Sequence, residues 1–146
     1  MTPSLSSVAQ RAESRMGPII RRCGSSRLEI GSQSRVWVHR LKQMPGTSII
    51  IGEGSLVSAR IACERAEARV SIGDGTFIGG SLLSAASEIE VGSGVLISSG
   101  CVLMDHDSHS LSWQLRKDDA RSWAVGKKNW YDVNMSRLVI EDHAWI

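Results

Sequence analysis

A short phrase that recurs along the chain constrains its fold more than any other feature. Each copy holds an apolar residue, an outward residue, a second apolar residue (the anchor) and usually a glycine. The anchors lie 21, 21, 19 and 49 residues apart. A period near 20 is typical of a solenoid, in which each turn buries its apolar edge against its neighbours. The last interval therefore holds one ordinary turn and about thirty extra residues. The five anchors are Ile30, Ile51, Ile72, Val91 and Ile140.

The pattern around each anchor predicts short strands. Val70 and Ile72 point inward while Ser71 points outward, which is the period of two expected for a strand. Glycine directly follows four of the five anchors, and we expect it to supply a corner with positive φ. Apolar residues also recur six positions after the anchors, as Ile78 follows Ile72. This spacing predicts three flat faces of about six residues in each turn.

Three segments carry a resemblance to a known family. IGDGTFIGG (72–80), VGSGVLISSG (91–100) and IEDHAWI (140–146) resemble the hexapeptide repeats of left-handed parallel β-helix acyltransferases. The left-handed coiling is implied by this resemblance, because parallel crossovers are otherwise right-handed. The prediction is an all-β chain, a single-stranded left-handed parallel β-helix over residues 28–146 with a protruding loop at 105–137.

Composition excludes several classes of protein. The 146 residues suit one domain, and a formal charge of +2 indicates no nucleic-acid-binding surface. Three widely spaced cysteines without a CxxC pair argue against a disulfide framework and a zinc knuckle. No apolar run is long enough to predict a membrane span or a secretion signal. We therefore expect a cytoplasmic protein.

Residues 1–27 are rich in serine and arginine and show little of the alternation seen in the repeats. We expect this segment to cap the first turn of the solenoid. An adaptor or membrane-surface role for the arginines at positions 11, 15, 21 and 22 is the alternative. A short helix ending at Gly17–Pro18 is expected, with these apolar residues along one face: Leu5, Val8, Ala12 and Met16.

The segment 105–137 interrupts the repeat. It contains three of the five tryptophans, the only tyrosine and two of the four histidines. Insertions of this length are usually functional or disordered, and aromatic enrichment argues against disorder. We expect an excursion that packs on the solenoid and walls a pocket.

The start of this segment, DHDSHS (105–110), alternates two imidazoles with two carboxylates. Histidine exchanges protons near neutrality, and a carboxylate on one ring nitrogen leaves the other free as a base. A structural interpretation remains, since polar residues also cluster where loops begin. Placement on a rigid scaffold favours the functional interpretation.

The resemblance also implies a reaction. In hexapeptide acetyltransferases the base is a histidine at the head of such a loop, followed by a small and then an aliphatic residue, which His109 matches. DHDSHS, GKKNWYDV (126–133) and VIEDHAWI (139–146) are most similar to the surface-polysaccharide branch. The implied activity is direct transfer from acetyl-CoA to a sugar hydroxyl, with backbone N–H donors on the oxyanion. Asp107, in preference to Asp105, would orient the imidazole. The family implies a homotrimer with its sites between chains and needs no metal.

Further residues are candidates for binding. Lys127 and Lys128 suit CoA phosphates, as do Arg116 and Lys117, although Asp118 and Asp119 make a solvated mixed-charge surface an alternative. Trp145 is a further candidate for CoA contact. The tryptophans of the segment suit a sugar platform or a pantetheine wall, with simple packing as the alternative. The candidates for the acceptor are His106, Trp113, Trp130 and Tyr131.

Two alternative functions remain open. One is a zinc site like that of γ-carbonic anhydrases, using His106, His109 and either His143 or a histidine of a neighbouring chain, since three histidines can hold zinc with one open position. The other is a non-catalytic solenoid that acts as a scaffold. The family repeat normally continues beyond Ile146 with further turns that contact CoA. A product shortened at its C-terminus, or partner chains that cover this end, is therefore expected.

Overall fold

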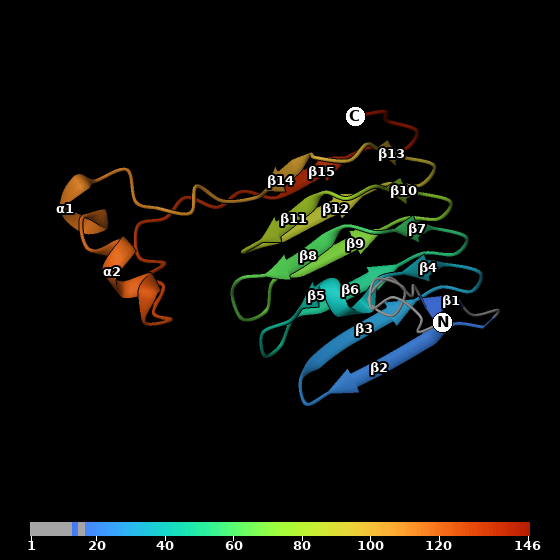
Figure 1. The fold of residues 1–146 in the computed structure, drawn as a ribbon, viewed down its shortest axis with the longest axis horizontal. Helices are drawn as coiled ribbons and strands as arrows, with labels where there is room; N and C mark the ends of the chain where they lie inside the picture. Colours follow the sequence, from blue (N-terminus) through green and yellow to red (C-terminus); the bar gives the residue numbers. More distant parts are fainter. Residues whose placement is uncertain (1–12, 15–16) are drawn as a thin grey trace, which may run out of the picture.

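The computed structural model describes residues 13–14 and 17–146, and it is a parallel β-solenoid with three sheets around one core (Figure 1). The first sheet contains β1 (Glu13–Ser14), β4 (Arg35–Val36), β7 (Leu56–Val57), β10 (Phe77–Ile78) and β13 (Leu96–Ile97). The second contains β5 (Leu41–Lys42), β8 (Arg60–Cys63), β11 (Leu82–Ala85) and β14 (Val102–Met104). The third contains β2 (Ile19–Cys23), β3 (Ser26–Ile30), β6 (Ser48–Ile51), β9 (Arg69–Ile72), β12 (Glu88–Val91) and β15 (Leu138–Ile140).

The five predicted anchors are confirmed as one column of the third sheet. Ile30 pairs with Ile51, Ile51 with Ile72, Ile72 with Val91, and Val91 with Ile140. The last pair joins strands separated by the inserted segment, so the insertion leaves the register unchanged. The predicted three faces are also confirmed, because each turn passes through all three sheets.

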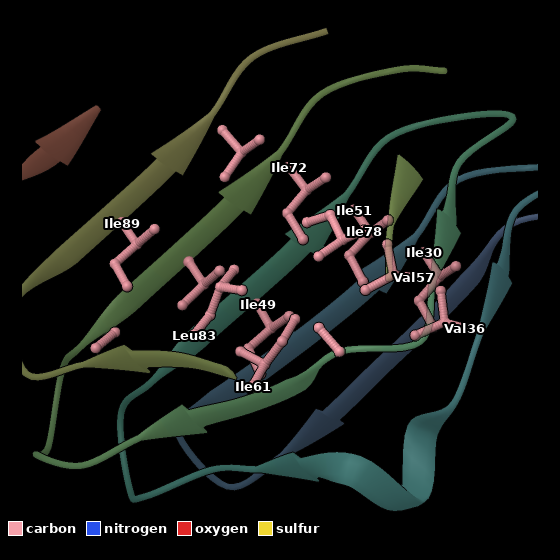
Figure 2. Close-up of a cluster of buried hydrophobic side chains, with 14 of the residues drawn as sticks. Ile30, Val36, Ile49, Ile51, Val57, Ile61, Ile72, Ile78, Leu83 and Ile89 are labelled. Carbon is pink, nitrogen blue, oxygen red and sulfur yellow. The ribbon is translucent and has the colours of Figure 1, made fainter. Parts of the chain in front are cut away.

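The core consists of the inward residues of these strands (Figure 2). In β9 the buried Val70 and Ile72 alternate with the more exposed Arg69 and Ser71. Ile72 and its neighbours are almost wholly removed from water. Each buried aliphatic side chain contributes about 1.5–3 kcal/mol of hydrophobic free energy. Stacked aliphatic side chains therefore hold successive turns together.

The glycine after each anchor has a role different from the predicted one. Positive φ occurs two residues later, at Gly54 (62°), Gly75 (60°) and Gly94 (64°). At Gly73, a Cβ atom would lie 2.6 Å from the carbonyl carbon of Gly92 in the next turn. The anchor glycine is needed because adjacent turns approach too closely for a side chain.

Replacing Gly73 by alanine is expected to destabilise the protein by about 1–3 kcal/mol, as overpacked interiors do. Gly80→Ala is the matched control, because the nearest atom to its added Cβ would be Ser99 Oγ at 3.8 Å. The midpoint of chemical denaturation of both variants tests this expectation. Equal losses in the two variants would contradict it.

The N-terminal region covers the first turn with β2, which pairs antiparallel with β3. Residues 19–23 thus form a strand, although their sequence shows little alternation. The antiparallel partner occupies the edge of β3 that would otherwise expose unpaired backbone groups. The residues named for the predicted helix, Leu5, Val8, Ala12 and Met16, lie outside the described residues. Glu13–Ser14, within its span, form β1 and pair antiparallel with β4, so the helix prediction is wrong there.

The inserted segment, residues 105–137, forms an arm between β14 and β15. It carries α1 (Trp113–Arg116) and α2 (Asp119–Ala124). The remaining helical element, the 3-10 turn η2 (Val38–Arg40), lies in the solenoid directly before β5. Figure 1 shows both α-helices projecting away from the stacked turns, so the tip of the arm does not pack on the solenoid as expected. Within the described part of the chain, no helix has the length and apolar character needed to cross a membrane.

Candidate active site

The arm has an outgoing leg before α1 (residues 105–112) and a returning leg after α2 (residues 125–137). At the base of the arm, the two legs form a short antiparallel pairing. The Asp107 N–H donates to the Asn134 carbonyl at 3.0 Å, and the Ser136 N–H donates to the Asp105 carbonyl at 2.8 Å. His106 and Met135 form a β-bridge between these bonds. The two legs therefore leave the solenoid as one unit.

Asp105 fastens this base to the solenoid. Its carboxylate accepts hydrogen bonds from the backbone N–H groups of Ala86 and Ser87, both at 2.7 Å. The residue is only 4% exposed. Hydrogen bonds to a carboxylate are stronger than neutral ones, so Asp105 fixes the position where the arm begins.

His106 is buried at the same place. Its Nδ1 accepts a hydrogen bond from the Ser108 N–H at 3.1 Å, so in the neutral ring the proton is on Nε2, which lies 3.1 Å from Ser84 Oγ. Burial, followed by the charge of Lys128, lowers the pKa of His106 below its ordinary value. Both ring nitrogens are engaged in hydrogen bonds, so His106 helps to anchor the arm. The residue also lines a cleft of about 320 Å³ at the base of the arm, and acceptor binding by His106 stays a prediction.

His109 is turned away from His106 by the backbone of Ser108. Ser108 adopts a positive φ of 64°, and the His109 N–H bonds back to the Asp107 carbonyl at 2.7 Å. Such a conformation is uncommon for a residue with a side chain. The turn directs His109 toward α2, so the two histidines have separate surroundings.

The side chain of His109 is held on two sides. Its Nδ1 lies 2.7 Å from Asp119 Oδ2, and its ring stacks on Trp123 with centroids 4.4 Å apart and planes at 17°. Because a carboxylate accepts, Nδ1 carries the proton and the lone pair of a neutral ring is on Nε2. No hydrogen bond to Nε2 comes from residues 13–14 or 17–146. This is the arrangement that a general base requires.

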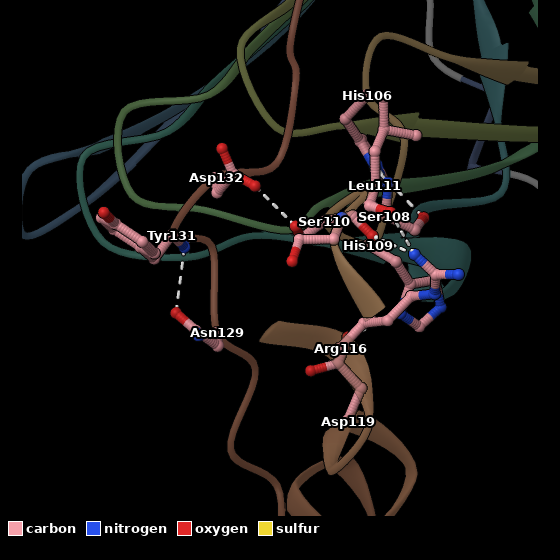
Figure 3. A network of polar contacts seen from close by, with 11 residues as sticks. His106, Ser108, His109, Ser110, Leu111, Arg116, Asp119, Asn129, Tyr131 and Asp132 are labelled. Atoms are coloured by element: carbon pink, nitrogen blue, oxygen red, sulfur yellow. Dashed lines mark hydrogen bonds and ion pairs between the residues drawn. The ribbon is translucent and has the colours of Figure 1, made fainter. Parts of the chain in front are cut away.

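An open cleft of about 680 Å³ adjoins His109 on the arm. Leu111 and Trp113 give it an apolar wall, while Lys117 adds a positive charge. Figure 3 shows the surrounding polar network, in which Ser110 Oγ donates to Asp132 at 2.6 Å and joins the two legs. The cleft thus combines a basic nitrogen, apolar surface and a cation.

The carboxylate that orients His109 differs from both predicted ones. Asp107 accepts from Asn134 Nδ2 at 3.0 Å, and Asp105 is occupied by the solenoid backbone. Asp119 makes the contact instead, from the first turn of α2. Nearness in sequence favoured Asp107, but α1 folds back and brings a residue ten positions away to the ring. In the sequence, nothing around Asp118 and Asp119 indicated that Asp119 contacts a histidine instead of lying in solvent.

The predicted acceptor-binding aromatics are dispersed over the arm. Trp113 lines the cleft and is 62% exposed. The ring of Tyr131 is also exposed, while its backbone N–H bonds to Asn129 (Figure 3). Trp130 lies at the base, edge-on to His106 with centroids 5.2 Å apart. Of these three aromatic residues, Trp113 is the one that lines the cleft beside His109, whereas Trp123 stacks on the His109 ring itself.

The predicted CoA-binding cations have different surroundings. Arg116 donates to the backbone carbonyls of Ser110 and Leu111, which makes it part of the cleft wall. Lys128 lies between two indole rings, whereas Lys127 is exposed. Arg116 and Lys117 are therefore the predicted cations that line the cleft with His109, and Arg116 is the one engaged with backbone carbonyls.

Trp145 lies apart from this site within one chain. It is 86% exposed and forms a parallel bridge with Leu96, which extends the first sheet. The legs of the arm extend from the junction of the second and third sheets. A role for Trp145 at the same site would require a second chain.

A second cleft, of about 450 Å³, lies on the solenoid and is basic. His39, Arg40 and Arg60 line it together with Lys42, which pairs with Glu64 at 3.0 Å. These residues come from successive turns. An alignment of the repeats could have shown that these basic residues lie side by side on the solenoid. The overall composition of the chain did not indicate such a basic cleft.

The zinc hypothesis is not supported within one chain. Across the described ranges, no group of three or more histidine, cysteine or acidic side chains is arranged to hold a metal. Both ring nitrogens of His106 are engaged, and His143 lies in the turn after β15. The structure does not bring the three histidines together.

Replacing Asp119 by asparagine is expected to lower any activity that depends on His109 by about 10-fold or more, because the amide no longer stabilises the charged imidazolium. Asp107→Asn is expected to have a smaller effect, and Asp118→Asn almost none, since Asp118 makes no capping hydrogen bond. Steady-state rates of the three variants test this order. A larger loss for Asp107→Asn would return the orienting role to that residue.

Comparison with known proteins adds no family to these observations. No family model matches the chain, and neither a curated protein nor a solved structure matches it. The geometry of the site and the resemblance of the repeat motifs are therefore what supports a function.

Proposed function

We propose that the chain is a CoA-dependent acyltransferase of the hexapeptide-repeat type that acetylates a hydroxyl group of a sugar or polysaccharide. The observation that carries this proposal is the hydrogen bonding of the His109 ring. Asp119 holds its Nδ1 at 2.7 Å, and its Nε2 has no partner among the residues described. A base in that tautomer beside an open cleft suits removal of a hydroxyl proton.

The cleft suits acetyl-CoA as the co-substrate. Leu111 and Trp113 provide apolar contact for a pantetheine arm, and Lys117 provides a cation for a phosphate. When bound, acetyl-CoA supplies the activated acyl group. His109, Leu111, Trp113 and Lys117 are the residues that would contact donor and acceptor.

His109 performs the proton transfers of the proposed reaction. Its Nε2 takes the hydroxyl proton as the acceptor oxygen attacks the thioester carbonyl carbon. Asp119 stabilises the imidazolium while the C–O bond forms and the C–S bond breaks. His109 then returns the proton to the departing thiolate, so proton and charge balance. Such acid–base catalysis typically contributes about 10²- to 10⁴-fold.

The proposed assembly is a homotrimer in which a neighbouring chain completes each site. The arm extends away from its own solenoid (Figure 1). Leu111 is 75% exposed and Trp113 is 62% exposed, which leaves apolar surface beside the cleft. A second chain over this surface would bury it and exclude water from the reaction. The free cysteines Cys23, Cys63 and Cys101 suit the reducing cytoplasm that we propose as the location.

Calorimetric titration with CoA and acetyl-CoA, with the oligomeric mass measured on the same sample, tests the proposal. Saturable binding by a trimer, weakened in Lys117→Ala, is expected. Arg121→Ala is the control, because this arginine lies on α2 outside the cleft. A folded protein that binds neither compound would contradict the proposal and favour a scaffold.

A further inference from the structure

Lys128 occupies an unusual position on the returning leg of the arm. Its Nζ lies 4.6 Å from the ring centroid of Trp123 and 4.1 Å from that of Trp130. Both distances fall within the range for attraction between a cation and an aromatic face, and indole is the best partner for it. One ammonium group therefore holds two indoles that come from α2 and from the leg.

Each of the two indoles also contacts one of the histidines of the arm. Trp123 stacks on the ring of His109 with centroids 4.4 Å apart, and Trp130 meets His106 edge-on at 5.2 Å. The result is a column of rings, centred on Lys128, that runs from the buried base of the arm to the candidate base. We call these five residues the ring column: His106, Trp130, Lys128, Trp123 and His109.

The lower end of the ring column is fixed to the solenoid. His106 Nε2 lies 3.1 Å from Ser84 Oγ in β11. The Arg65 guanidinium lies 5.8 Å from the Trp130 centroid and donates to Met135 Sδ at 2.9 Å. Trp130 is therefore tied to the solenoid through Arg65 and through His106.

At the upper end, the orientation of the Trp123 indole depends on its contacts with His109 and Lys128. The Trp123 Nε1–H is buried and has no hydrogen-bond partner within the described ranges, so no polar contact fixes the orientation of this indole. Its packing between His109 and Lys128 is what sets its plane. Lys128 is partly buried at this position, and this burial lowers its pKa.

We propose that Lys128 is a positioning residue, whose ammonium acts as a clamp that links Trp123 to Trp130 through its contacts with both rings and thereby holds the imidazole of His109 at the angle that its contact with Asp119 requires. Its effect on catalysis rests on the proposed function, whereas its effect on the ring of His109 does not. Lys128 was predicted from the sequence to bind CoA phosphates, and its place inside the column argues for this different role.

Histidine-ring NMR tests the proposal without any need for activity. In the wild-type protein the Trp123 ring current should displace the ring-proton signals of His109, which are assigned with His109→Gln. Lys128→Ala should remove about half of this displacement or more, because the clamp is lost. Lys128→Arg, which restores a cation between the rings, should recover it. Lys127→Ala is the neighbouring control and should leave the signals unchanged.

Kinetics separate the proposal from the proposed function. If the enzyme transfers acetyl groups, Lys128→Ala should lower kcat by about 10- to 10²-fold through misplacement of the base, with the KM for acetyl-CoA within about twofold of wild type. A changed NMR signal without transferase activity would support the clamp and reject the function. An unchanged signal in Lys128→Ala would overturn the clamp. If that variant does not fold, Lys128→Gln, which keeps chain length without charge, gives the same two outcomes.

Discussion

Replacement of His109 by alanine is expected to lower acetyl transfer by about 10²- to 10⁴-fold, the usual contribution of a general base. The side chain is 43% exposed beside the cleft, so its removal leaves no buried cavity. The fold and the binding of CoA should both persist, because the base acts on the acceptor proton. Initial rates measured as thiol release from acetyl-CoA, with acceptor present, provide the test.

The control for this experiment is Arg121→Ala, which removes a charged side chain from the same arm outside the cleft. It should retain the wild-type rate. Circular dichroism and oligomeric mass of both variants show whether the solenoid remains intact. Unchanged turnover in a folded His109→Ala protein would reject His109 as the base, whatever the effect of Asp119→Asn.

Replacement of Ile51 by alanine is expected to reduce the free energy of unfolding by about 2–5 kcal/mol, the range for large-to-small changes in a core. Ile51 is 1% exposed and lies in the anchor column between Ile30 and Ile72. Removing its side chain leaves a cavity that the paired strands on both sides cannot close. Guanidinium denaturation followed by circular dichroism and tryptophan fluorescence measures the loss.

Ile50→Ala is a close control, because Ile50 is the adjacent residue of β6 and points to the other face of the sheet. Its neighbours across the strands are Glu29 and Ser71, and it is only partly buried. The loss here should be about 1 kcal/mol or less, the span of strand preference. Similar losses for Ile50→Ala and Ile51→Ala would contradict the assignment of the core face.

Sequence reasoning selected His109 on the inserted segment, and its role as a base stays a prediction, whereas the residues around it were not identified. The position of His109 beside an open cleft on the inserted segment follows from the break in the repeat and from the polar motif that begins it. Its orienting partner did not follow, because Asp119 reaches the ring only after α1 reverses the chain. The stacking of Trp123 and Lys128 likewise depends on how α2 and the returning leg meet.

The sequence by itself determined the solenoid, its register and the place of the insertion. Strand alternation and the period near 20 recur in every turn, so each turn is directed to the same three-sided path. For this reason Ile140 pairs in register with Val91 even though the arm separates them in sequence. Only the tertiary structure decided the glycine roles and the surroundings of His109. Close approach at Gly73 and the contacts of the ring column join residues from different turns or legs. Such contacts depend on three-dimensional packing, which no local pattern encodes.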